Sequence, residues 1–432
     1  MRNFVRRNSL HMRTSLIALF ACAAFLVAAV TALDPSCVAP NNTIPVWTAA
    51  PVFVSSVPNG KLYQAGTGND TFNVLHLYGT PYQQGYAQGQ LLSSTIKGLT
   101  NDLVAFIEQE AEQAASWLPV WLIDAVVANG APFLLELTFN ATKPFAPQRY
   151  LEEMQGIADG AGVDVKDVQN YNMFPEMTKA ACTIVGATGS ATSNGKISHL
   201  RGLDFTPTCP IASFPQVTIY HDSTPGPVLA NVGWTGMVGV LTGLSNTSIG
   251  IGEKVWINHP KDIESTYGEP WMFILRDALA SANMTQALSR IQNANRTCAI
   301  HVGVGDSTTN TFNGLTIAAK AYDVYNWQSL NWTGHPIIQD VFYWDKHVQP
   351  SHNPCLGEYL QEFWGNIDAE KLALNIAAPF GTGDMHCVTF DYSTGIAFIA
   401  NARKPSVTAG TLPAYYRQFT RLDLNALWNL AQ

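Results

Sequence analysis

Two short apolar runs on either side of a turn-rich spacer constrain the fold of this chain more than any other feature. The first run begins at Cys182 and reads Cys-Thr-Ile-Val-Gly, and the second covers residues 196–205. Strand-like runs joined by a connection rich in Gly, Ser, Thr and Asn predict a β-hairpin. With the turn centred near residues 192 and 193, antiparallel pairing places Cys182 opposite Gly202 or Leu203.

This hairpin places Arg201 and Asp204 on the strand opposite the Cys182 thiol. A thiol, a fixed cation and a carboxylate that converge can build a nucleophile. Arg201 and Asp204 are three residues apart, so a regular strand points them to opposite faces; a bulge at Gly202 would re-aim one of them. The alternative is purely structural: an ordinary buried cysteine beside a strand-end ion pair.

Residues 1–32 have the pattern of a secretory signal peptide. Four arginines precede an uncharged apolar run over residues 14–32, which ends in Ala-Val-Thr-Ala. The run is just long enough to span a bilayer, so an uncleaved anchor is the alternative. The helix-breaking Asp34-Pro35 that follows favours cleavage near Ala32.

Glycosylation sequons agree with a secreted or lysosomal route. The Asn-X-Ser/Thr motifs begin at Asn41, Asn69, Asn140, Asn246, Asn283, Asn295 and Asn331. The net charge of −8 argues against nucleic-acid binding, which needs a basic face.

The length of the remaining chain, residues 33–432, by itself suggests two or three domains. Because it has no recognisable linker, charge block or repeat, one large domain fits it at least as well. The hydrophobic content of the full chain, 47%, is ample for a core of that size. No Cys-x-x-Cys spacing occurs, and neither a metal nor a cofactor is expected. In an oxidising compartment we expect most of the cysteines beyond the signal peptide to pair; they are Cys37, Cys182, Cys209, Cys298, Cys355 and Cys387.

Other segments have helical or strand-like patterns. Thr80 and Pro81 suit the N-cap and first position of a helix, and Gly85 and Gly89 give it one smooth face for close packing. Strands are predicted over residues 71–77, 168–173, 215–221, 228–234, 237–241, 248–255, 299–304, 315–319, 340–343 and 388–400. Helices are predicted over residues 91–112, 150–161, 271–281, 285–291, 356–364 and 369–377. Early helices and a long central block of strands fit two stacked sheets covered by helices.

Two more segments, residues 117–127 and 132–139, are strongly apolar. We interpret them as partly buried helices. The alternative is an exposed rim that docks on a membrane surface or admits a lipid tail, with tips at Trp117, Trp121, Phe133 and Leu134.

These residues together resemble the cysteine-type N-terminal-nucleophile hydrolases. Gly79-Thr-Pro-Tyr-Gln-Gln-Gly-Tyr-Ala-Gln-Gly89 is similar to the opening of the acyl-CoA:6-aminopenicillanic acid acyltransferase family. Residues 152–162 and 170–176 look like the segment before the cleavage site of acid ceramidase and N-acylethanolamine acid amidase. The most specific match is Cys182-Thr-Ile-Val followed by Arg201-Gly-Leu-Asp204-Phe205.

The resemblance implies an α+β fold, a four-layer αββα sandwich with an N-terminal helical segment. It also implies that an inactive precursor cuts itself between Ala181 and Cys182. The products are a helix-rich light chain (33–181) and a heavy chain (182–432), an αβ heterodimer from one precursor. Cleavage frees the α-amine of Cys182, whose ordinary pKa of about 8 suits it to take the thiol proton.

Roles for the other site residues also come from the resemblance. Arg201 holds substrate or stabilises developing negative charge, Asp204 orients the α-amine, and Glu253 matches a glutamate of the amidase site. The alternative for Glu253 is a strand-end surface charge. By analogy with ceramidase, Cys37 and Cys355 form a disulfide.

This chain departs from the family pattern at two places. Gly202 replaces the asparagine that follows the arginine, and the oxyanion asparagine has no counterpart: Tyr343 or Asp345 falls near that position. A tyrosine hydroxyl can donate to an oxyanion, whereas an ionised aspartate cannot.

The resemblance therefore implies an amidohydrolase that cleaves an N-acyl, ceramide-like lipid through a cysteine thioester. One alternative is an acyltransferase that passes the acyl group to an amine. A second is an inactive, glycosylated lipid-binding protein.

Overall fold

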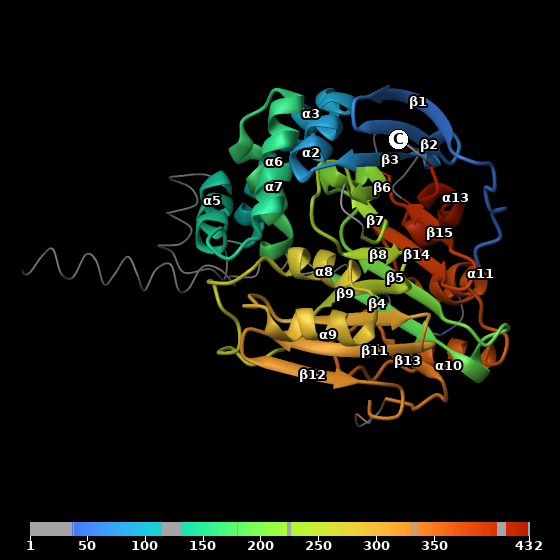
Figure 1. The fold of residues 1–432 in the computed structure, drawn as a ribbon. Helices are drawn as coiled ribbons and strands as arrows, with labels where there is room; N and C mark the ends of the chain where they lie inside the picture. Colours follow the sequence, from blue (N-terminus) through green and yellow to red (C-terminus); the bar gives the residue numbers. More distant parts are fainter. Residues whose placement is uncertain are drawn as a thin grey trace, which may run out of the picture.

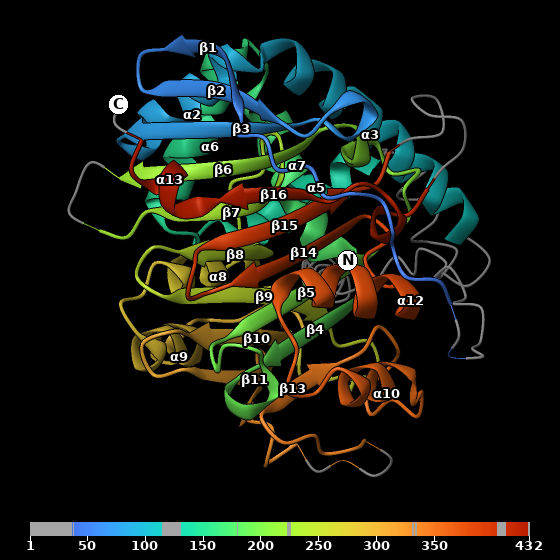
Figure 2. The same ribbon diagram turned by 90° about the vertical axis from the view of Figure 1, so that its right-hand side faces the viewer.

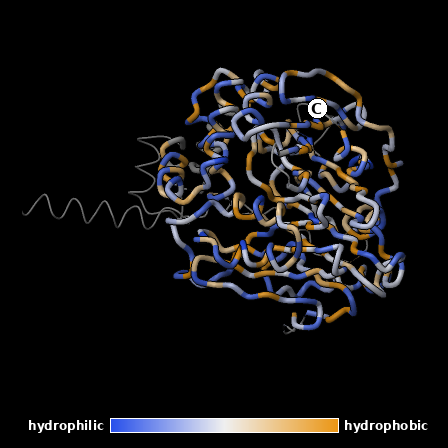
Figure 3. The backbone as a smooth tube through the Cα atoms, in the orientation of Figure 1, coloured by the Kyte–Doolittle hydropathy of each residue, from blue (hydrophilic) through white to orange (hydrophobic). Residues whose placement is uncertain are grey.

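The computed structural model describes residues 37, 39–114, 131–178, 180–222, 226–330, 332, 335–403 and 412–430. Two β-sheets stack face to face at its centre, and helices cover both outer faces (Figures 1 and 2). Hydrophobic residues recur along the central strands (Figure 3). The signal-peptide region, residues 1–32, lies outside the described residues.

The larger sheet has ten strands, in the spatial order β1-β2-β3-β6-β7-β8-β9-β10-β11-β12. Neighbouring strands are antiparallel except β3 and β6, which run parallel. Their bounds are β1 Val52–Val57, β2 Gly60–Ala65, β3 Phe72–Gly79, β6 Pro215–Asp222, β7 Leu229–Trp234, β8 Thr242–Ser245, β9 Ile249–Val255, β10 Ile300–Asp306, β11 Thr311–Ala318 and β12 Ala321–Tyr325.

The smaller sheet has six antiparallel strands, in the order β13-β4-β5-β14-β15-β16. Their bounds are β13 Val341–Trp344, β4 Ala181–Ala187, β5 Ser198–Asp204, β14 His386–Asp391, β15 Ile396–Asn401 and β16 Thr420–Asp423. The predicted hairpin is β4 and β5, at the centre of this sheet.

Helices form the two outer layers. Against the ten-stranded sheet lie α2 Pro81–Leu91, α8 Trp271–Leu279 and α9 Met284–Asn293. Four further helices pack on α2 and on one another: α3 Ser93–Ala114, α5 Ala131–Thr142, α6 Gln148–Ala161 and α7 Val165–Met177. Against the six-stranded sheet lie α10 Cys355–Glu362, α11 Ala369–Lys371, a π-helical turn Leu372–Ala377 and α12 Ala378–Phe380. The short helix α13 Leu424–Trp428 packs on β15 and β6.

Three hydrophobic clusters separate these four layers. The first lies between the helices and the ten-stranded sheet and includes Leu75 and Met272. The second lies between the six-stranded sheet and α10 and includes Leu356. The third fills the space between the sheets and includes Ile184 and Phe312. The fold is therefore the expected four-layer αββα sandwich.

Glycines on β9 and β10 bring the two sheets together above the hairpin. A Cβ atom on Gly252 would lie 3.0 Å from Cγ of Arg201, and one on Gly303 would lie 2.5 Å from Cγ2 of Ile184. Side chains of β4 and β5 therefore occupy the space that these glycines leave open, and Arg201 points into the gap between the sheets.

The helix predicted to begin at Thr80 is α2, and its N-terminus has the expected cap. The Thr80 hydroxyl accepts a hydrogen bond from the Gln83 amide, and the Gln83 side-chain oxygen accepts one from the Thr80 amide. Its smooth face packs closely on α6. A Cβ atom on Gly85 would lie only 2.0 Å from the Glu153 carbonyl oxygen.

Several sequence-based assignments are wrong. Residues 168–173, predicted as a strand, lie inside helix α7, because Asp164 caps that helix by accepting from the Lys166 amide. Residues 237–241 form an irregular connection before β8, and residues 388–400 form a strand pair, β14 and β15, joined by a tight turn. Strand β1, residues 52–57, has no counterpart among the predicted strands.

Candidate active site

The hairpin has the predicted pairing but not the bulge. Cys182 lies opposite Leu203 and Ala181 opposite Asp204, in an uninterrupted register. Gly202 serves another purpose: a Cβ atom there would lie 2.7 Å from the Thr382 hydroxyl oxygen and 3.0 Å from the Gly383 nitrogen. The glycine thus lets the 382–383 backbone approach the strand.

Arg201 is the centre of a buried polar cluster on the face between the sheets. Its Nη2 lies 3.5 Å from Sγ of Cys182 and donates to Oε2 of Glu253 at 3.1 Å. Its Nε donates to the Glu253 carbonyl at 3.1 Å, and its Nη1 lies 2.8 Å from Nε2 of His386. Arg201, Cys182 and Glu253 are at most 2% exposed. The structure therefore places Glu253 in the cluster rather than at a surface strand end.

Burial dominates the protonation states of this cluster. It raises the pKa of the Cys182 thiol to about 12, against the opposing effect of the Arg201 cation. It raises the pKa of Glu253 to about 7, again opposed by Arg201. It lowers the pKa of His386 well below its ordinary value, so neutral Nε2 accepts from Arg201. In the uncleaved chain the thiol is protonated and needs a proton acceptor before it can react.

Asp204 points to the opposite face of β5, as the regular register requires. Its carboxylate lies 2.7 Å from the Thr382 hydroxyl oxygen and accepts from the Gly383 amide at 2.7 Å. The Thr382 hydroxyl is also 2.7 Å from that of Thr183. Because Asp204 pairs with Ala181, its carboxylate is held beside the Ala181–Cys182 peptide bond, on the face opposite Arg201.

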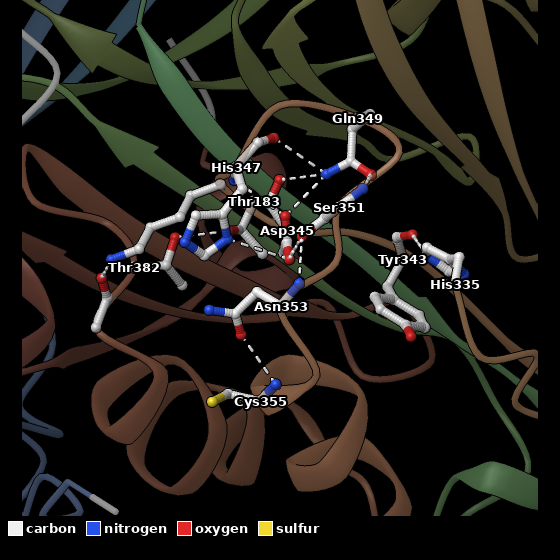
Figure 4. A network of polar contacts seen from close by, with 12 residues as sticks. Thr183, His335, Tyr343, Asp345, His347, Gln349, Ser351, Asn353, Cys355 and Thr382 are labelled. Carbon is white, nitrogen blue, oxygen red and sulfur yellow. Dashed lines mark hydrogen bonds and ion pairs between the residues drawn. The ribbon is translucent and has the colours of Figure 1, made fainter. Parts of the chain in front are cut away.

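The Asp345 carboxylate holds its own loop together (Figure 4). Its carboxylate accepts from the Ser351 hydroxyl at 2.6 Å, the Gln349 side chain at 2.8 Å and the His347 amide at 2.9 Å. Although burial raises its pKa, hydrogen bonds from His347 and Ser351 give a net lowering. An ionised carboxylate only accepts hydrogen bonds, so Asp345 is not an oxyanion donor.

Tyr343 is also turned away from the cysteine. It pairs with Val185, and its hydroxyl donates to the Pro336 carbonyl at 3.3 Å. Its ring packs on His335, with centroids 4.2 Å apart. The structure therefore supports neither Tyr343 nor Asp345 as the oxyanion residue.

An apolar pocket opens beside Cys182. Leu203, which pairs with Cys182, and Ala180, two residues before it, form part of the wall. Among the described lining residues, Glu253 is the one with an ionisable side chain. The other lining residues are Phe174, Pro175, Thr178, Phe205, Ile211, Trp234, Met237, Leu241, Val255 and Trp271. A substrate group in this pocket would meet mostly aliphatic and aromatic side chains.

The remaining predicted residues lie far from this pocket in the sequence. Cys37 and Cys355 form a disulfide, the pair that the resemblance implies. The expectation that most cysteines pair is wrong for the described chain, where Cys182, Cys209, Cys298 and Cys387 remain thiols. Cys209 and Cys387 are both buried among hydrophobic residues. They belong to different core clusters, so the two thiols are separated from each other.

Most of the sequons are accessible. Asn41, Asn69, Asn140, Asn246 and Asn295 are exposed and Asn283 is half-buried, while Asn331 lies outside the described residues. Of the proposed rim, Phe133 is half-buried, and Trp117, Trp121 and the Leu134 side chain lie outside the described part.

Sequence reasoning missed His386, Thr382 and Lys254. His386 and Thr382 come from a segment near the C-terminus that only the sheet topology brings to β5. Lys254 follows Glu253 on β9 and is 1% exposed. A lysine inside a strand of glycines and aliphatic residues was the signal available for it.

Among the described residues, no three His, Cys, Asp or Glu side chains are grouped to hold a metal ion. In the same part of the chain, no helix has the length and apolar character needed to cross a membrane.

Similarity to known proteins identifies the family of this chain. Protein dcd1A of Dictyostelium discoideum is 37% identical over 428 residues, which cover 94% of this chain and 96% of that protein. The chain belongs to the dcd1 family. A second dcd1 protein of the same organism, dcd1B, is 34% identical over 409 residues, covering 89% of this chain and 80% of that protein. No protein-family profile matches this dcd1 chain.

Solved structures overlap the dcd1 chain only in part. The Caenorhabditis elegans N-acylethanolamine-hydrolyzing acid amidase ortholog covers 49% of this chain and 93% of its own, with a TM-score of 0.38 and 17% identity. Penicillin V acylase from Agrobacterium tumefaciens covers 51% and 83%, with a TM-score of 0.33 and 9% identity.

Proposed function

We propose that this dcd1 protein is a self-processing amidohydrolase in which Cys182 becomes the N-terminal nucleophile. The observation that carries the proposal is the buried contact of the Arg201 guanidinium with both the Cys182 sulfur and the Glu253 carboxylate. Such a site at the start of a strand, one bond from Ala181 and beside an apolar pocket, is arranged for chemistry rather than for packing alone.

The first reaction is the cleavage of the chain itself. The Cys182 sulfur attacks the Ala181 carbonyl carbon, the peptide C–N bond breaks, and a thioester joins Ala181 to the Cys182 side chain. The released α-amine keeps a proton from the thiol. Water then hydrolyses the thioester, which leaves a carboxylate on Ala181 and both a thiol and an amine on Cys182. The amine, with an ordinary pKa of about 8, is the proton acceptor that the uncleaved site lacks.

The second reaction uses that amine on an external amide. The α-amine takes the thiol proton, the thiolate attacks the substrate carbonyl, and the substrate amine leaves with the proton. Water hydrolyses the resulting thioester and releases the acid. Arg201 stabilises the negative charge, Glu253 holds Arg201 in place, and Asp204 lies beside the Ala181–Cys182 bond, where it can accept a hydrogen bond from the new amine.

The pocket favours an apolar acyl group. Its walls are Phe174, Leu203, Trp271 and similar side chains, and Glu253 is the one ionisable residue among the described lining. Burial of an alkyl chain contributes about 0.8 kcal/mol per methylene group, so an N-acyl amide with an apolar acyl chain is the substrate class that this lining favours. The exposed sequons and the disulfide suit a glycosylated protein of the secretory or lysosomal route.

The test compares the wild-type protein with Cys182→Ala after expression in a secretory host. We expect the wild type to yield two chains and to hydrolyse an N-palmitoyl aminocoumarin, and the variant to remain one chain without activity. Cys209→Ala, which removes another buried thiol outside the Arg201 cluster, is the matched control and should be processed and active like the wild type. A Cys182→Ala protein that is still processed or active would exclude the proposal.

A further inference from the structure

Lys254 is a buried lysine that the proposed chemistry does not use. It lies on β9 next to Glu253 and is 1% exposed. Its ammonium donates to the Lys346 carbonyl at 3.4 Å, and within the described chain no carboxylate lies within ion-pair distance of it. A buried cation without a counter-ion is unfavourable unless the surroundings carry negative charge.

The geometry of the two sheets aims this lysine at the Cys182 end of the hairpin. On β9, Gly250, Gly252 and Lys254 share one face, and Gly252 faces Arg201 on β5. β9 packs on both β4 and β5 (Figure 2). Gly252 lies over Arg201, and Lys254 follows it two residues further along β9.

The hydrogen-bond partner of Lys254 identifies the same end of the site. Trp344 pairs with Ile184, which is two residues from Cys182 on the same face of β4. β13 is antiparallel to β4, so the chain beyond Trp344 runs toward Cys182. The Lys346 carbonyl that accepts from Lys254 therefore lies on the Cys182 side of Trp344.

The other charges around Cys182 are already compensated. The Arg201 cation is paired with Glu253 at 3.1 Å, and the Asp345 carboxylate is held by three donors. Asp204, on the far face, accepts from Thr382 and Gly383. His301, opposite Lys254 on β10, and His386, beside Arg201, have pKa values well below the ordinary one because they are buried, so both are neutral.

We propose that Lys254 is a positioning residue that supplies the uncompensated positive charge of this site and stabilises the Cys182 thiolate. This inference rests on the proposed role of Cys182 as nucleophile. Burial lowers the pKa of the Lys254 amine, while Cys182 and the carboxylates of Asp345, Asp204 and Glu253 raise it. The same attraction favours loss of the Cys182 proton.

The experiment compares Lys254→Gln, Lys254→Arg and the wild type as processed enzymes. Gln keeps a donor for the Lys346 carbonyl but loses the charge, and Arg keeps the charge. The exposed Lys320 provides the matched control, Lys320→Gln. Two quantities are measured across pH: the rate of Cys182 alkylation by iodoacetamide, followed by mass spectrometry, and kcat/KM for N-palmitoyl aminocoumarin.

We expect Lys254→Gln to move the acidic limb of both profiles to higher pH by about one unit or more and to lower kcat/KM at pH 5 by about tenfold or more. In Lys254→Arg and Lys320→Gln, the acidic limb of both pH profiles should lie at the same pH as in the wild type. If Lys254→Gln does not accumulate as processed enzyme, Lys254→Met, which removes the buried charge without a new polar group, is measured instead.

An unshifted limb in the uncharged variant would overturn the inference, whether or not activity falls, because a merely structural lysine lowers activity without moving the profile. That result leaves the nucleophile in place. Full activity of Cys182→Ala, in contrast, would remove the proposed function itself.

Discussion

The Arg201 guanidinium lies between Cys182 and Glu253, with its Nη2 atom 3.5 Å from the sulfur and 3.1 Å from a carboxylate oxygen. Cys182 and Arg201 come from one hairpin of the six-stranded sheet, whereas Glu253 comes from β9 of the other sheet. The site thus exists only when the sheets are stacked, and Gly252 provides the room for the arginine.

Replacement of Arg201 by lysine should lower kcat/KM by about 100-fold or more. Lysine keeps the charge, but it cannot bond Glu253, the Glu253 carbonyl and His386 at once, and loss of one aligned donor has effects of this size. Steady-state kinetics on the processed enzyme measure the effect. Arg149→Lys, at a half-exposed ion pair with Asp277, is the control and should change little. Equal kinetics for the two variants would refute the assigned role of Arg201.

The contact between α2 and α6 gives a prediction on stability. Gly85→Ala should destabilise the protein by about 1–3 kcal/mol, because its Cβ would lie 2.0 Å from the Glu153 carbonyl oxygen. Gly98→Ala in α3 has nothing within 4 Å of its Cβ and should be neutral or stabilising by up to about 1 kcal/mol. Melting temperatures of the two variants test the contrast, and the same melting temperature for both would contradict the close packing.

Glu176 should make the protein more stable at acidic than at neutral pH. Burial raises its pKa to about 7, opposed by hydrogen bonds from the Trp271 amide, the Thr297 hydroxyl and the Cys298 thiol. An unfolded glutamate titrates near pH 4.3. Between these values the folded state holds a proton that the unfolded state has lost, so the free energy of unfolding falls as pH rises through this window, by up to about 4 kcal/mol.

Glu176→Gln isolates this contribution because glutamine has no charge to titrate. We expect the wild type to lose stability relative to the variant between pH 4.5 and 7.5, as measured by thermal unfolding in a Cys182→Ala background, which keeps the chain intact. Buried histidines such as His199 act in the opposite direction but are the same in both proteins and cancel. A stability difference that does not change with pH would show that Glu176 titrates normally.

The disulfide predicts how the processed protein behaves on a gel. Cys37 belongs to the proposed light chain and Cys355 to the heavy chain, so cleavage before Cys182 leaves the two chains covalently joined. Processed material should migrate as one species without reductant and as two with it. For Cys37→Ala, two chains should separate even without reductant. Two chains from the wild type under non-reducing conditions would contradict the assigned pair.

Local chemistry made part of this structure predictable. Thr80 and Pro81 begin α2 because a cap and a first-turn proline act within a few residues, and Cys182 pairs with Leu203 because a hairpin is a short-range contact. The strand predicted over residues 168–173 fails because the cap at Asp164 begins a helix whose buried residues resemble a strand core.

The parts of the site that sequence reasoning missed depend on distant contacts. Lys254 and His386 reach the hairpin only through the stacking of the sheets and the pairing of β14 with β5. Asp345 was expected near the oxyanion because of its place in the sequence. Its carboxylate is instead used by its own loop, through Gln349 and Ser351.

The most direct test of the account is the N-terminal sequence and intact mass of each chain in active, secreted protein. The account predicts a heavy chain that begins at Cys182 and a light chain that ends at Ala181. Active protein in which the Ala181–Cys182 bond is intact would contradict it, because Cys182 would then have no α-amine to take its proton.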